Sequence, residues 1–167
     1  MSNINVKDIH LSIVLIGQFN PAIVTPQWLA LKKLIRESEA ENSNIQITHP
    51  EVSQFSLPFA DFSIVKNKFQ VNCSDGSQFD TVRDLVTSIF TILSETPVSG
   101  IGINHIYHFD LSDNETYFNF GNWLSPQSIW DESLKKSGLI DLKVIEADFS
   151  DTGVKKQVQL NPSELHR

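Results

Sequence analysis

The stretch FSIVKNKFQVNC, Phe62–Cys73, predicts a β-hairpin, and the fold class follows from it. Apolar and polar side chains alternate on both sides of Lys66-Asn67, which is typical of strands that bury one face. Strands joined by so short a turn pair antiparallel. The hairpin therefore pairs Phe62–Val65 with Phe69–Cys73 and indicates an antiparallel sheet.

Other segments supply further strands. Ile9–Phe19 is partly apolar on both faces, which predicts a central strand. Between Asn44 and Phe59 the pattern also has period two, and it predicts one strand that is interrupted or bulged at His49-Pro50. The remaining predicted strands are Val98–Leu111 and a last hairpin of Leu139–Phe149 with Val154–Leu160 around SDTG.

Three segments predict helices. The clearest is Phe79–Leu93, where apolar residues recur at helical spacing. Thr25-Pro26 is a cap followed by proline, so a helix begins there, and we expect it to fray near Glu37, Glu39 and Glu41 because acidic charge opposes the dipole at a helix C-terminus. Ser125-Pro126 repeats the device for a short helix that Gly138 ends.

This order of elements predicts an α+β fold, a single two-layer domain over residues 1–167. We expect a curved, mostly antiparallel sheet of about six or seven strands with about two or three helices packed on one face. Residues 1–8 and 161–167 are expected to be flexible termini.

Composition excludes several functions. Thirteen Lys and Arg against 20 Asp and Glu give a net charge of −7, which opposes binding to nucleic acid or an anionic membrane surface. The single cysteine, Cys73, excludes an internal disulfide and fits a reducing compartment. The apolar run near the N-terminus is too short to span a bilayer, so we expect a cytoplasmic protein.

The segment GINHIYHFD, Gly102–Asp110, carries the most reactive side chains. On a strand, His105 and His108 point to opposite faces, so they cannot bind one metal ion together. His108 and Asp110 share a face and could form an oriented imidazole, although a structural histidine is favoured. A small-molecule site built here would use Asn104, Tyr107, His108 and Asp110.

No motif of a common enzyme class is present. The sequence has no Gly-rich phosphate loop, no Gly-x-Ser-x-Gly elbow and no His-Glu-x-x-His. We therefore assign no catalytic residue, no metal ligand and no cofactor, and the balance is against an enzyme.

Aromatic residues gather in TYFNFGNW, which contains Tyr117, Phe118, Phe120 and Trp123. If these side chains are buried, the segment is a lid packed over the sheet, and this interpretation is favoured. If they are exposed, they form an interaction surface, because rigid aromatic side chains dominate interface energetics.

Several motifs together resemble a sporadically distributed family of uncharacterised small bacterial proteins: GQFNPAIVTPQWL, HPEVSQF, RDLVTSIFTIL and TPVSGIGINHIYHF. The resemblance covers roughly Ile9 to Phe109. It implies a bacterial or phage-related origin and a small free-standing cytosolic protein, but no activity and no site residues. Families of this kind often travel with mobile or defence-associated genes.

Two functions remain open. The first is a non-enzymatic module that binds a protein partner or itself as a homo-oligomer, in a setting such as toxin neutralisation or phage defence. Its acidic surface would suit a basic partner. The alternative is a small-molecule binder or an atypical enzyme, with a pocket between the sheet and the helix over 79–93.

Overall fold

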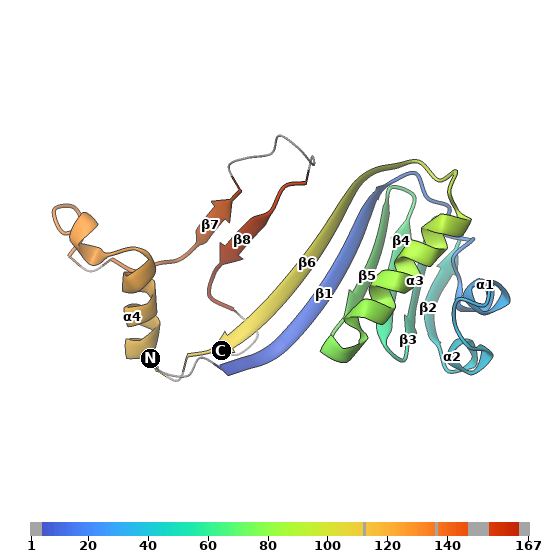
Figure 1. Cartoon of the computed structure of the whole chain (residues 1–167), viewed down its shortest axis with the longest axis horizontal. Coiled ribbons are helices and arrows are strands. Elements are labelled where there is room, and N and C mark those ends of the chain that lie inside the picture. Colours follow the sequence, from blue (N-terminus) through green and yellow to red (C-terminus); the bar gives the residue numbers. More distant parts are fainter. Residues whose placement is uncertain (1–4, 112, 136, 147–153, 164–167) are drawn as a thin grey trace. The chain divides into compact units, whose positions relative to one another are not determined.

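The computed structural model describes residues 5–111, 113–135, 137–146 and 154–163. It confirms the α+β fold: helices accompany a six-stranded antiparallel sheet and a small two-stranded sheet (Figure 1). The chain divides into two compact units, of which the larger is Val6–His108 and the smaller includes the residues from Phe109 onward. Each unit is described by itself, and the single domain over 1–167 stays a prediction.

The large sheet has the strand order β2-β3-β4-β5-β1-β6. Its strands are β1 (Asn5–Gly17), β2 (Asn44–His49), β3 (Val52–Leu57), β4 (Ala60–Val65), β5 (Lys68–Cys73) and β6 (Val98–Asp110). The hairpin predicted first is confirmed as β4 and β5, with Val65 opposite Lys68 across Lys66-Asn67. The first strand begins at Asn5, so Asn5–Asp8 belong to β1 and not to a separate terminal segment.

One face of the sheet is covered by the helix α3 (Phe79–Ile92), which a 3-10 turn, η1 (Gly76–Gln78), precedes (Figure 1). Burial alternates along β3, β4 and β5, as the period-two pattern predicted. The helix buries Val82, Leu85, Val86 and Ile89. Each such side chain contributes about 1.5–3 kcal/mol when it leaves water, so this interface is the main stabilising contact.

Phenylalanine rings connect the sheet to the helix. Phe55 of β3 stacks on Phe62 of β4, with ring centroids 4.6 Å apart. Phe69 of β5 meets Phe90 of α3 edge to face at 5.0 Å. Aromatic pairs of this geometry add about 0.5–1.5 kcal/mol beyond the area that they bury.

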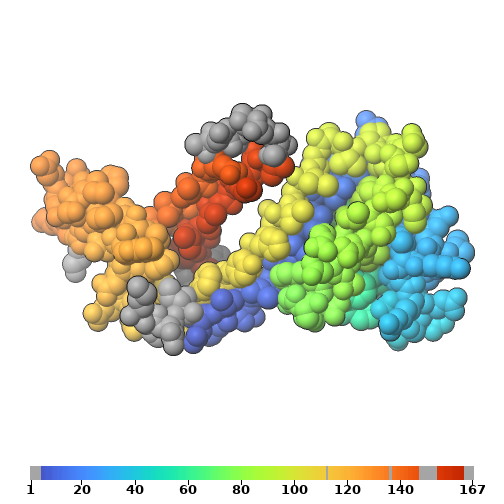
Figure 2. Space-filling model, viewed as in Figure 1, coloured from blue at the N-terminus to red at the C-terminus, as the bar shows by residue number. Residues whose placement is uncertain are grey.

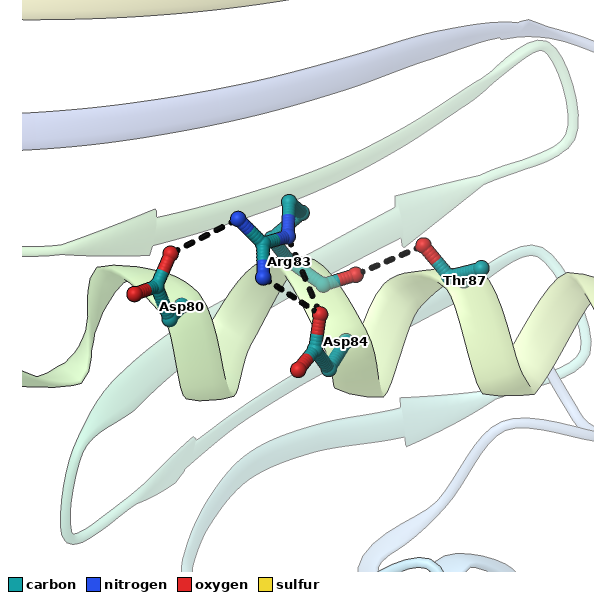
Figure 3. A network of polar contacts seen from close by, with 4 residues as sticks. All are labelled: Asp80, Arg83, Asp84 and Thr87. Carbon is teal, nitrogen blue, oxygen red and sulfur yellow. Dashed lines mark hydrogen bonds and ion pairs between the residues drawn. The ribbon is translucent and has the colours of Figure 1, made fainter.

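The outer face of α3 is polar, as its sequence predicted. Arg83 lies between two acidic residues, with Nη1 2.7 Å from Asp80 Oδ1 and Nη2 2.8 Å from Asp84 Oδ1 (Figure 3). The hydrogen bond to Asp84 and the charges of both carboxylates raise the pKa of Arg83. Thr87 Oγ1 donates to the Arg83 carbonyl at 2.9 Å. This network lies in water and marks a solvated face.

The prediction of one interrupted strand at His49-Pro50 is wrong. The chain reverses at Pro50-Glu51, and β2 and β3 are two antiparallel strands with His49 opposite Val52. Pro50 cannot donate to a ladder, and the turn is where this costs nothing. The register irregularity lies between Ile45 and Ile47 instead.

The helix expected from Pro26 is two short helices, α1 (Pro26–Leu31) and α2 (Glu37–Glu41). Thr25 caps α1 as predicted, since its Oγ1 accepts from Trp28 N at 3.2 Å. Lys33 then adopts a φ of 59°, and Leu34 N donates back to Leu29 O. Glu37 and Glu39 therefore lie in the first turn of α2, where acidic charge stabilises the dipole, and our expectation that they oppose it is wrong.

The aromatic stretch after β6 forms a helix, α4 (Asn114–Leu124). Asp113 caps it, with Oδ1 accepting from Thr116 N at 2.6 Å. The helix expected after Ser125-Pro126 is only a 3-10 turn, η2 (Gln127–Ile129). The last hairpin is present but shorter, as β7 (Leu142–Ile145) and β8 (Gln157–Leu160), and its SDTG turn lies outside the described residues.

Lys33 provides a test of this local geometry. Its positive φ is a conformation that glycine adopts without the steric cost of a Cβ. We expect Lys33→Gly to raise the free energy of unfolding by about 0.5–1 kcal/mol in a denaturant titration. The control is Lys32→Gly, where φ is −81° and glycine only adds unfolded-state entropy, so stability should fall. If Lys33→Gly lowered the free energy of unfolding, this would contradict the positive φ of Lys33.

Candidate functional site

Strand β6 lies at one edge of the large sheet, next to β1. Ser99 Oγ donates to Ile16 O at 3.2 Å, and Asn104 Nδ2 donates to Ser12 O at 3.3 Å, so the two strands run antiparallel. The β5 ladder covers only Leu11–Ile16 of β1. The remaining part of β1 and its β6 partner residues therefore continue past β5 as a two-stranded ribbon (Figure 1).

The two faces of β6 differ in what they meet. His105 lies on the face covered by α3, with its ring centroid 6.0 Å from that of Phe79. His108 lies on the open face, with its ring 5.5 Å from that of His10. The odd spacing therefore separates the two histidines, as the strand pattern predicted.

The four predicted ligand residues do not all share one face. Alternation places Asn104, His108 and Asp110 on the open face and Tyr107 on the opposite one. A ligand between them would have to reach around the strand. As a small-molecule site this set stays a prediction, and the strand geometry does not favour it.

The open face holds a polar contact that sequence reasoning missed. His10 Nδ1 lies 3.0 Å from Ser74 Oγ, because the pairing of Leu11 with Cys73 brings their neighbours together. These residues are 64 positions apart in the chain, so no local motif could have revealed them. Among the described residues, no group of three or more His, Cys, Asp or Glu side chains could hold a metal ion.

The edge formed by Val98–Ile106, called the β6 edge below, is mostly apolar and contains no acidic residue, lysine or arginine. The segment from Val98 to Phe109 contains no Lys, Arg, Asp, Glu or Pro. Beside α3, Ile101 is 67% exposed and Ile103 is 54% exposed. Val98 and Ile106 are exposed on the open face. In Figure 2 the strand, coloured yellow-green to yellow, runs along the surface beside β1.

Backbone direction makes this edge able to pair. At the end of β1, Gly17 N donates to Asn67 O on the β5 side, and Gln18 N donates to Pro97 O on the β6 side. Gln18 N therefore lies on the side of β1 that faces β6, where the Asn104 side chain also donates to Ser12 O. Because β6 has a strand neighbour on one side only, alternate residues of β6 direct their N–H and C=O groups away from β1.

The opposite edge of the sheet is built differently. Strand β2 has six residues, against 13 in β6, and it carries the register shift between Ile45 and Ile47. A short, bulged strand next to a proline turn is a poor template for another strand. Of the two edges, β6 is the longer one, and Val98–Phe109 carries no Lys or Pro.

The predicted aromatic interaction surface lies entirely on α4. Tyr117 OH donates to Leu139 O at 2.8 Å, and Phe120 contacts Trp123 at a ring distance of 6.3 Å. Phe118 and Trp123 are 58% and 76% exposed. None of the residues of α4 is buried, and the use of this helix in binding stays a prediction.

A pocket of about 350 Å³ lies at the C-terminal end of α3. It is lined by Phe19, Ile64, Phe69 and Phe90, by the polar residues Gln18, Asn20, Glu95 and Thr96, and by Ile23, Val24, Ile92, Leu93 and Pro97. A pocket between sheet and helix was the alternative prediction, but none of Asn104, Tyr107, His108 and Asp110 lines this one.

Comparisons of the chain with protein-family models, curated proteins and solved structures found no match. The resemblance to a sporadic bacterial family therefore stays a prediction. Among the described helices, none is both long and apolar enough to cross a membrane.

Cys73 offers a test of the buried face. Its side chain is 2% exposed, its Sγ donates to Asp75 O at 3.3 Å, and burial raises the pKa of the thiol. A raised pKa means less thiolate at any given pH, so a disulfide reagent at neutral to mildly alkaline pH should react slowly until denaturant is added. In the matched control, Cys73→Ser with Ser74→Cys, the thiol moves to the exposed side and should react at once. If the two thiols reacted at equal rates without denaturant, this would contradict the placement of Cys73 on the buried face of β5.

Proposed function

We propose that this chain is a protein-interaction module that binds its partner by adding a strand to the β6 edge. The observation that carries the proposal is the combination of outward-directed backbone groups with exposed Ile101 and Ile103 and an uncharged strand. Strand addition uses main-chain hydrogen bonds for affinity and alternate side chains for specificity. The β6 edge offers both.

The surroundings of the edge support this use. Natural proteins protect long edge strands with lysine, proline or bulges, because an open edge pairs with other chains. Strand β6 carries one acidic residue at its end, Asp110, whereas Val98–Phe109 contains no Lys, Arg, Asp or Glu. An acidic protein with an uncharged apolar edge fits recognition of an extended, apolar partner segment.

Selection from a random decapeptide display library tests strand addition. Bound peptides should be rich in β-branched and aromatic residues, and their binding should protect alternate amides of Val98–Ile106 from hydrogen exchange. Ile103→Lys should weaken binding at least about tenfold, because it places a charge at the edge. Ile47→Lys on β2 is the control and should leave binding unchanged. Peptides that ignore Ile103→Lys would refute the proposal.

A second candidate function is small-molecule binding in the pocket at the end of α3. Its volume of about 350 Å³ lies in the range of ligand sites, and its lining is mostly apolar with a few polar groups. Gln18, Asn20 and Glu95 supply acceptors, so a compact apolar molecule with an N–H donor would suit it.

Indole is a suitable probe of this pocket. At millimolar indole, amide NMR signals of Phe19, Phe90 and Thr96 should shift together. Thr96→Trp fills the pocket and should abolish these shifts. Thr91→Trp, on the exposed side of α3, is the control and should preserve them. Shifts that survive Thr96→Trp would exclude the pocket as the site.

A further inference from the structure

We infer that the β6 edge pairs with the β6 edge of a second copy of this chain, antiparallel and centred on Gly102. This inference rests on the proposed function, because it names the partner that the same edge takes. The two sheets would join into one continuous sheet across a two-fold axis, which is the closed symmetry that most homodimers have.

The sequence of the β6 edge is self-complementary about Gly102. In this register Ile101 faces Ile103 of the second copy, and Val98 faces Ile106. Apolar side chains thus meet apolar ones on both faces of the joined sheet, and such cross-strand pairs contribute roughly 0.2–1 kcal/mol each. The polar pair Ser99 with His105 and the pair Gly100 with Asn104 complete the seam.

Neighbouring registers match less well. In a two-fold pair, only registers centred on a residue, and not between two residues, place the outward-directed residues of both copies opposite each other. Centring on Ile103 would place Ile101 against His105, and Gly100 against Ile106. Centring on Asn104 would place Ile103 against His105, and Val98 against Asp110. Centring on Gly102 is the register that pairs all four exposed aliphatic residues with one another.

The distribution of charge favours contact between two copies at the β6 edge. Each copy carries a net charge of −7, so two copies repel each other over most of their surface. The β6 edge contains no ionisable group except His105, and Asp110 lies beyond the paired segment. Two copies can therefore approach here without placing like charges opposite each other.

Gly102 itself provides a direct test. A Cβ at Gly102 would lie 4.0 Å from its nearest neighbours, so a side chain fits there. In the proposed register Gly102 faces Gly102 of the second copy, and the Cα atoms of directly opposite residues are about 4.5–5.5 Å apart, within the range that a disulfide spans. Gly102→Cys should therefore form a disulfide-linked dimer under mild oxidation.

Cysteine variants at other positions of β6 test the register of the pairing. Gly100→Cys also has open space, but Gly100 faces Asn104 of the second copy and not itself. Gly102→Cys should cross-link roughly tenfold faster than Gly100→Cys, because paired strands hold two facing thiols at high effective concentration. Gly100→Cys mixed with Asn104→Cys should give the heterodimer. Equal rates for Gly102→Cys and Gly100→Cys would overturn the register.

Sedimentation equilibrium of the unmodified chain and of Ile103→Lys tests the pairing without cysteine. The unmodified chain should dimerise at roughly micromolar concentration, and Ile103→Lys should weaken the dimer at least about tenfold. A monomer at high concentration that still binds peptides at the β6 edge would overturn self-pairing and leave the proposed function standing. A dimer that is insensitive to Ile103→Lys, with no peptide binding at the edge, would overturn both.

Discussion

The packing of α3 against the alternate residues of the sheet is the contact on which the structure depends. Val82 and Ile89 of the helix are fully buried, as are Phe69 and Val71 of β5. Because side chains alternate along a strand, burying one face fixes which residues of every neighbouring strand turn inward. The register of the β4–β5 hairpin and the position of β1 follow from that requirement.

The same alternation creates the exposed surface. Leu11, Ile13 and Leu15 of β1 are buried beneath the helix, whereas Ile101 and Ile103 on the same face of β6 remain exposed. Strand β6 is the outermost strand on its side of the sheet and has one strand neighbour among the described residues. The exposure of its apolar side chains is the reason that binding at the β6 edge is the function that we propose.

The histidine, serine and cysteine side chains do not form a common site, so the proposed function rests on the backbone of the edge strand β6 instead. His105 and His108 are close in sequence, but the strand separates them, and each packs against a ring from another element. His10 and Ser74 are distant in sequence and lie 3.0 Å apart. Cys73, the single thiol, is buried and its pKa is raised, which makes it a core residue. These contacts position the ribbon of β1 and β6 and do not converge on one cavity.

The sequence by itself determined the α+β class, the β4–β5 hairpin, the bounds of α3 and the opposite faces of His105 and His108, because each follows from local periodicity. It failed where local signals compete: Lys33 ends α1 in a conformation that favours glycine, and α4 forms within a polar, aromatic stretch. Only the tertiary structure decided that β6 is an edge strand and that His10 meets Ser74. Strand order and register depend on pairings between residues far apart in the chain, and these leave no mark within a short segment.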